Sequence, residues 1–137
     1  MLYSTMGLHC LNLQGEILSY LPVDMNTVQS VSLSSQGCLI ISAAHNYDEA
    51  TRVMAVDGNG ALAFNKLTEE RVLDAVLLRD LLCLRFENTV SVYDTEQTLP
   101  IVLLPVEGNF SAALAYSNNE ILLCGPARAV CIKIDIP

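Results

Sequence analysis

The two histidines are the side chains best suited to acid–base chemistry at neutral pH, and imidazole is also a common metal ligand. His9 lies in an apolar stretch and His45 in a polar one. Neither belongs to an H-E-x-x-H or H-x-E motif, and no G-x-S-x-G segment marks a serine nucleophile. The sequence therefore predicts no catalytic residue, and we expect the protein not to be an enzyme.

The five cysteines are the next candidates, because thiolates act as nucleophiles and bind zinc. Their number is odd, they form no C-x-x-C pair, and each lies in an apolar stretch. This pattern is typical of free thiols buried in a protein of a reducing compartment, so we expect no disulfide, no metal and no cofactor. These residues are Cys10, Cys38, Cys83, Cys124 and Cys131.

The segment Asp57-Gly58-Asn59-Gly60 carries the carboxylate and amide oxygens that calcium prefers. It lacks the later bidentate glutamate of a calcium loop. Asp-Gly and Asn-Gly steps supply the positive φ angles that tight hairpins require. The segment therefore predicts a turn between two strands rather than a metal site.

The composition limits the class of protein and of partner. The chain has 137 residues, of which 52% are hydrophobic and 16% charged, so it is globular and forms one domain or less. Its net charge of −8 and its scattered basic residues argue against binding to nucleic acid or to anionic membrane surfaces. Apolar runs stay near four residues, far below a membrane span, and we expect a cytoplasmic protein.

The elements that position these residues are predicted to be β-strands. Residues 31–34 and 90–92 alternate apolar and polar side chains, and short β-branched stretches are bounded by Gly, Asn, Asp or Pro. The best helix candidate, residues 67–82, has no clear pair of caps and its apolar residues are too continuous for one face. We therefore predict strands there as well, and an all-β chain.

A repeat runs through this strand pattern. Four segments share an apolar strand that ends in a polar residue, and they recur roughly every forty residues, the spacing of a propeller blade. Other short strands lie between them, joined by polar turns. The four segments are 9–14, 52–57, 90–94 and 130–135.

The repeat predicts a partial, open β-propeller, WD-repeat-like, with about three and a half four-stranded antiparallel blades. The predicted blades are residues 1–26, 27–68, 69–107 and 108–137. An open arc exposes strand edges, so we expect self-association, or completion by another chain or by further blades of a longer protein. A β-sandwich built from the same strands remains the alternative.

This strand order resembles the amino-terminal blades of the PROPPIN family, seven-bladed WD-repeat-like propellers that bind phosphoinositides in autophagy. The best stretch is 71–94, which contains Arg-Asp in a turn and ends in Val-Ser-Val-Tyr-Asp. Residues 111–126 are similar to the following blade, and residues 5–13 to the first. The family's lipid-binding Arg-Arg-Gly is absent, because no two arginines are adjacent here. The resemblance therefore implies a docking surface on the early blades, with Arg79 as a contact, and does not carry over lipid binding.

The remaining candidate contacts lie in the polar connection between two strands, since loops on a rigid scaffold often bind partners. They are His45, Tyr47, Asp48 and Glu49. We expect a non-catalytic scaffold for protein partners, PROPPIN-like in autophagy or membrane trafficking. Two alternatives stay open: a phosphoinositide reader whose basic motif comes from further blades, or a purely structural subunit of a larger complex.

Overall fold

The computed structural model describes residues 2–4, 7–23, 27–34, 37–43, 50–94 and 99–135. Every regular element in these ranges is a β-strand, so the all-β prediction is confirmed. The chain divides into two compact units, residues 1–70 and 71–137. Each unit contains two small antiparallel sheets.

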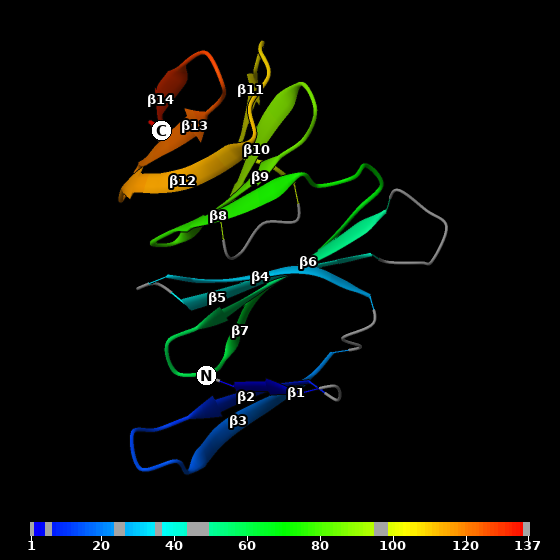
Figure 1. The fold of residues 1–137 in the computed structure, drawn as a ribbon, viewed down its shortest axis with the longest axis vertical. Helices are drawn as coiled ribbons and strands as arrows, with labels where there is room; N and C mark the ends of the chain where they lie inside the picture. The colour runs from blue at the N-terminus through cyan, green and yellow to red at the C-terminus, as the bar shows by residue number, and fades with distance from the viewer. Residues whose placement is uncertain are drawn as a thin grey trace. The chain divides into compact units, whose positions relative to one another are not determined.

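The first unit runs from blue through cyan to green in Figure 1 and holds a three-stranded and a four-stranded sheet. The strand orders are β1-β2-β3 and β4-β5-β6-β7. The strands are β1 (Leu2–Ser4), β2 (Gly7–Leu11), β3 (Ile17–Pro22), β4 (Val28–Ser34), β5 (Gly37–Ala43), β6 (Thr51–Asp57) and β7 (Leu62–Thr68).

The second unit runs from green through yellow to red in Figure 1 and holds a four-stranded and a three-stranded sheet. The strand orders are β8-β9-β10-β11 and β12-β13-β14. The strands are β8 (Asp74–Leu78), β9 (Leu81–Arg85), β10 (Thr89–Asp94), β11 (Val102–Pro105), β12 (Ala112–Ser117), β13 (Glu120–Cys124) and β14 (Ala129–Lys133).

All four sheets are meanders, in which strands that follow one another in the chain also lie side by side. Short turns favour this order, because an antiparallel neighbour then pairs at a small cost in loop entropy. The segment 67–82 contains the end of β7, all of β8 and the start of β9, so the prediction of strands there is confirmed.

Two predicted strands were too long. The stretch 130–135 was expected to be a strand as far as Asp135, but β14 ends at Lys133. The stretch 9–14 was expected to be a strand as far as Gln14, but β2 ends at Leu11 and residues 12–16 form the turn to β3. Asn12 causes this, because its side chain bonds to the backbone and ends the ladder. Polar residues of this kind end strands, so the polar residue that matters in this segment is Asn12 and not Gln14.

The two sheets of the first unit share one apolar core. Leu8 of β2 and Val23 after β3 pack with residues of β5 and β6. The β5 and β6 members are Cys38, Ile40, Met54 and Val56. Alternate residues of each strand face this core, as the period of two requires.

The core of the second unit is built in the same way. Val76, Cys83 and Val92 of the four-stranded sheet pack with Ile121 and Leu123 of the three-stranded sheet. All five residues of β9 are buried, which explains why its sequence is continuously apolar up to Arg85. The two sheets therefore stabilise each other through a shared interior, and large-to-small changes there remove buried apolar surface.

Candidate functional site

Arg79 lies in the two-residue turn between β8 and β9, where Leu78 pairs with Leu81. Its side chain is exposed and contacts Asp80 at 3.7 Å between Nε and Oδ2. Both side chains are more than two-thirds exposed (72% and 83%), so this ion pair contributes little to stability. Arg79 is thus accessible to a partner, as a docking contact must be.

The backbone of Arg79 has a φ of 38°, and Arg79 is the one non-glycine residue with positive φ in the described part of the chain. A side chain with a Cβ is disfavoured in this region. We expect Arg79→Gly to raise the free energy of unfolding by about 0.5 to 1 kcal/mol, measured by chemical denaturation. Asp80→Gly is the matched control. It should lower the free energy of unfolding, because the φ of Asp80 is not positive and glycine relieves no strain there.

The four contacts expected in the polar connection between β5 and β6 are His45, Tyr47, Asp48 and Glu49. All four lie outside the described residues. Their role in binding stays a prediction.

A second group of charged residues holds β12 and the connection that precedes it, residues 106–111. Asp74 accepts a hydrogen bond from the Ala113 N–H with its Oδ2, at 2.7 Å, and from the Ala75 N–H with its Oδ1, at 3.0 Å. The first bond joins β8 to β12 and so links the two sheets of this unit. Because a carboxylate accepts it, this bond is stronger than one between neutral groups.

Arg85 is the buried cation of this group. Its backbone lies opposite that of Asp74 in the β8–β9 ladder. Its Nη1 donates to the carbonyl oxygen of Phe110 at 3.2 Å. Its side-chain Nε is buried and has no hydrogen-bond partner. Arg85 thus fixes the start of β12 from the same neighbouring sheet as Asp74.

Arg128, in the turn between β13 and β14, holds the same connection. Its Nη2 donates to the carbonyl oxygen of Glu107 at 2.6 Å, and its guanidinium lies 5.5 Å from the centre of the Phe110 ring. Gly108 has a φ of 130°, and a Cβ there would meet the Arg128 guanidinium at 2.7 Å. Arg85 and Arg128 therefore hold the connection, and Asp74 holds the strand β12 that follows it. We call these three residues the charged clamp.

Sequence analysis did not find the charged clamp. Asp74 and Ala113 are 39 residues apart, and nothing local in either strand indicates that they meet. The sequence did contain one signal for this site. An acidic residue, Asp74, begins one apolar strand, and a basic residue, Arg85, ends the next. Charged residues rarely lie in such a setting without partners.

Two turns with the same hydrogen bonds follow β2 and β6. Asn12 Oδ1 accepts from the Gln14 and Glu16 N–H groups, and Asp57 Oδ1 accepts from the Asn59 and Ala61 N–H groups. The backbone bonds also match, and each strand pair has a register shift just before the turn. The prediction that residues 57–60 form a hairpin turn is confirmed.

The glycines of these two turns allow a matched experiment. Gly15 and Gly60 have φ angles of 84° and 82°, but a Cβ at Gly15 would meet nothing, whereas one at Gly60 would overlap Ser19 Oγ. We expect Gly15→Ala to cost about 1 kcal/mol of unfolding free energy and Gly60→Ala about 2, because the second also breaks the bond from Ser19 Oγ to the Gly60 carbonyl.

Thermal or chemical denaturation measures both values, and Ser19→Ala isolates the contact. Ser19→Ala alone should cost about 1 kcal/mol, and it should add little to Gly60→Ala. Equal costs for Gly15→Ala and Gly60→Ala would show that this contact between the two sheets contributes nothing.

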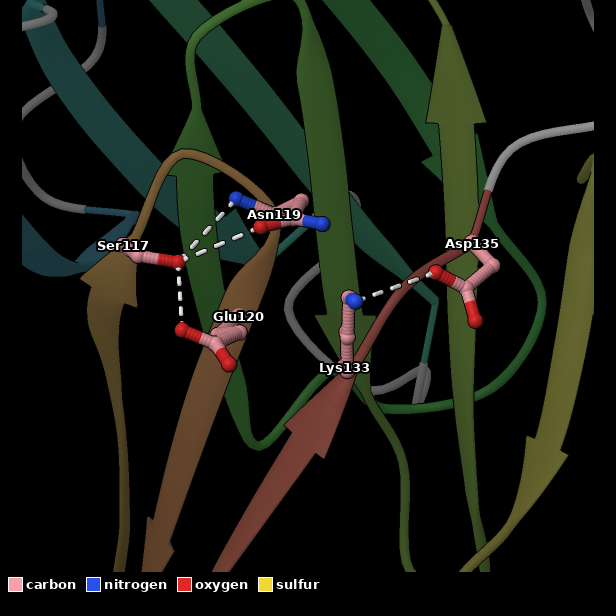
Figure 2. Close-up of polar contacts among 5 residues, drawn as sticks. All are labelled: Ser117, Asn119, Glu120, Lys133 and Asp135. Carbon is pink, nitrogen blue, oxygen red and sulfur yellow. Dashed lines mark hydrogen bonds and ion pairs between the residues drawn. The ribbon is translucent and has the colours of Figure 1, made fainter.

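A polar cluster lies at the end of the sheet β12-β13-β14 (Figure 2). Ser117 Oγ donates to Glu120 Oε2 at 2.7 Å and lies close to the Asn119 side chain and N–H. Lys133 Nζ is 3.9 Å from Asp135 Oδ1, at the end of β14. The cluster is exposed, and the part of the chain that the structure describes contains no group of three or more His, Cys, Asp or Glu residues that could hold a metal ion.

The cysteines divide into three classes. Cys10, Cys38 and Cys83 are buried free thiols, as predicted, whereas Cys124 is partly buried and Cys131 is exposed. The prediction of burial is therefore wrong for Cys131, which lies on an edge strand. Burial raises the pKa of the Cys83 thiol to about 12, and burial also raises the pKa of Cys38.

The chain matches no protein-family model and no curated protein sequence. Over the described ranges the structure contains no helix long and apolar enough to cross a membrane. The candidate sites are therefore the Arg79 turn, the charged clamp and the edges of the sheets.

Proposed function

We propose that the protein is a non-catalytic scaffold that presents the turns of propeller-like blades to protein partners. The observation that supports this best is the recurrence of one unit: four consecutive meander sheets, two of which contain the same turn at the same place. Fixed turns favour binding, since little conformational entropy is lost when a partner docks. The PROPPIN-like role in autophagy or membrane trafficking belongs to the same proposal.

In the proposed propeller, the two matched turns and the order of the strands in each sheet give the strands their places in a blade. β2 and β6 precede the matched turn and are third strands, and β3 and β7 follow it as fourth strands. β4, β8 and β12 are first strands, and β14 is a third strand. In a propeller, first strands line the centre and fourth strands the outside.

This placement gives a test of the propeller within a single chain. Spin labels carried by an unnatural amino acid leave the five cysteines intact. One pair of labels is placed where a first strand turns into a second strand, at Leu33 and Arg79. The other pair is placed on the fourth strands, at Leu62 and Leu103. Pulsed electron resonance should give a shorter distance for the first pair. A longer distance for the first pair would contradict a propeller.

The scaffold role is tested with Arg79→Gly, which keeps the turn and removes the guanidinium. Affinity capture from cells with cross-linking should recover a partner with the wild-type chain and lose it with this variant. Arg71→Gly, at another exposed arginine, is the control and should keep the partner. Capture that is unchanged by Arg79→Gly would exclude this turn as the docking contact.

A further inference from the structure

The two matched turns of the first unit differ at one step that matters for backbone chemistry. Gln14-Gly15 follows β2 and Asn59-Gly60 follows β6, and each pair occupies the same place in the shared hydrogen bonds. The two glycines also have nearly the same φ, 84° and 82°. Asn59-Gly60 is the one Asn-Gly step in the sequence. The turns therefore match in backbone, and the side chain before the glycine is one methylene group shorter in the second turn.

An asparagine before a glycine is reactive for a geometric reason. A bond between Cγ of Asn59 and the backbone nitrogen of Gly60 closes the small ring of a cyclic imide, whereas Gln14 would need a larger ring, which forms more slowly. Glycine has no Cβ to block the approach, and its backbone reaches conformations that other residues avoid. Asn59 is exposed and Gly60 is partly buried, so water reaches the side chain that reacts.

From this geometry we infer that Asn59 is a modification site, which deamidates to isoaspartate through a cyclic imide with the Gly60 nitrogen. The Gly60 nitrogen attacks Cγ of Asn59 and forms the N–Cγ bond. The bond from Cγ to the side-chain nitrogen breaks, and ammonia leaves with the proton of the Gly60 N–H. Water then opens the imide. Attack at the backbone carbonyl carbon leaves isoaspartate, and attack at the side-chain carbonyl carbon leaves aspartate.

The hydrogen bonds of the folded turn control this reaction. The Gly60 N–H donates to the Asp57 carbonyl oxygen at 3.0 Å, and the Gly60 carbonyl oxygen accepts from Ser19 Oγ at 3.0 Å. The Gly60 nitrogen must lose its bonded proton and turn toward the Asn59 side chain before it attacks, so these bonds open first. Such local opening has its own free energy, below that of global unfolding. The rate of modification therefore follows the opening of the turn, and Ser19, on β3 of the neighbouring sheet, slows it.

The product does not fit the closed turn. Isoaspartate carries the chain through its side-chain carbon, so one methylene group is added to the backbone between residues 59 and 60. A carbon added at Gly60 would overlap Ser19 Oγ and lie 3.0 Å from Cys10 Cβ, so the backbone has no room to shift there. The modified turn loses the bond from Ser19 to Gly60 and gains a negative charge near Asp57. Modification therefore weakens the contact between the two sheets of the first unit.

Ageing of the purified chain at mildly alkaline pH tests the site. We expect mass spectrometry of the peptide that contains residue 59 to show the mass change from NH2 to OH. A methyltransferase that recognises isoaspartate should transfer labelled methyl groups to the same peptide. Asn59→Gln keeps a side-chain amide and should lose both signals. The peptide that contains Gln14 is the control within the same chain and should stay unmodified.

Ser19→Ala tests the control by the neighbouring sheet. It should raise the rate of modification about fivefold, the factor by which a hydrogen bond of about 1 kcal/mol shifts an opening equilibrium. Ser111→Ala is the matched control, because Ser111 Oγ also donates to a backbone carbonyl oxygen, that of Cys124, and it should leave the rate unchanged. Circular dichroism checks that both variants are folded. The wild-type chain unfolded in urea should react faster than either variant, since no turn bond then holds Gly60.

Three results would overturn the inference. They are a residue 59 that stays unmodified even in urea, a rate in Ser19→Ala equal to that of the wild type, and a methyl label without the mass change. The last would place the reaction at Asp57, whose isomerisation releases no ammonia. This inference goes beyond the scaffold function and rests on contacts within the first unit. A failed propeller or a failed partner capture therefore leaves it untouched, and its own failure leaves them untouched.

Discussion

Asp74→Ala is expected to lower the free energy of unfolding by about 3 kcal/mol, measured by chemical denaturation. The Asp74 carboxylate accepts from the N–H groups of Ala113 and Ala75, and the first of these bonds joins the two sheets of the second unit. Alanine leaves the Ala113 N–H without its partner at a partly buried site. An unsatisfied buried donor costs more than a hydrogen bond gains, which is the reason for the size of the effect.

Two further variants separate this bond from a general effect of charge. Asp74→Asn keeps an oxygen acceptor and should recover more than half of the loss. Asp80→Ala removes the same charge from an exposed turn and should change the stability by less than about 0.5 kcal/mol. Hydrogen exchange should show the loss of protection at Ala113 first. A loss in Asp80→Ala equal to that in Asp74→Ala would contradict a specific role for the charged clamp.

Alkaline pH should destabilise the protein through Cys83. Burial raises the pKa of the folded thiol from 9.0 to about 12. Between these values the unfolded chain releases the proton and the folded protein keeps it, so stability is complete below about pH 9 and falls as the pH rises toward 12. Three pH units at 1.36 kcal/mol each give a loss of about 4 kcal/mol at the upper end.

The measurement is the unfolding free energy at several pH values between 8 and 11. Cys83→Ala lowers the stability at neutral pH, because it leaves a small cavity, but its alkaline decline should be much shallower. Cys131→Ser changes an exposed thiol and should keep the wild-type slope. If Cys83→Ala and the wild type declined with the same slope, the buried thiol would not be the group responsible.

The sequence was sufficient for the elements that depend on neighbouring residues. The period of two in residues 31–34 and 90–92 predicted strands, and β4 and β10 contain them. The segment 57–60 predicted a hairpin turn because Asp-Gly and Asn-Gly steps supply positive φ angles, and Gly60 has a φ of 82°. In the structure Asp57 Oδ1 also accepts hydrogen bonds from the backbone of its own turn. The strand through Gln14 was wrong because the same chemistry, in Asn12, ended it earlier.

Contacts between sheets could not be predicted in this way. Asp74 and Ala113 belong to different strands of different sheets, and the bond between them depends on how the two sheets pack. The same is true of Arg85, whose partner is a carbonyl oxygen that any residue could supply. Backbone partners leave no trace in the sequence, so the charged clamp had no recognisable motif.

The amino-acid sequence by itself determined that this chain is all-β, where most of its strands and turns lie, and that its strands recur with a regular period. Alternation and turn chemistry are local, and so they can be read along the chain. Only the tertiary structure decided which strands lie at sheet edges and which residues join one sheet to the next. β10 and β14 show why: both are short apolar strands, but β10 lies between β9 and β11 and is largely buried, whereas β14 alternates between exposed and partly buried residues. This difference comes from the packing of each sheet.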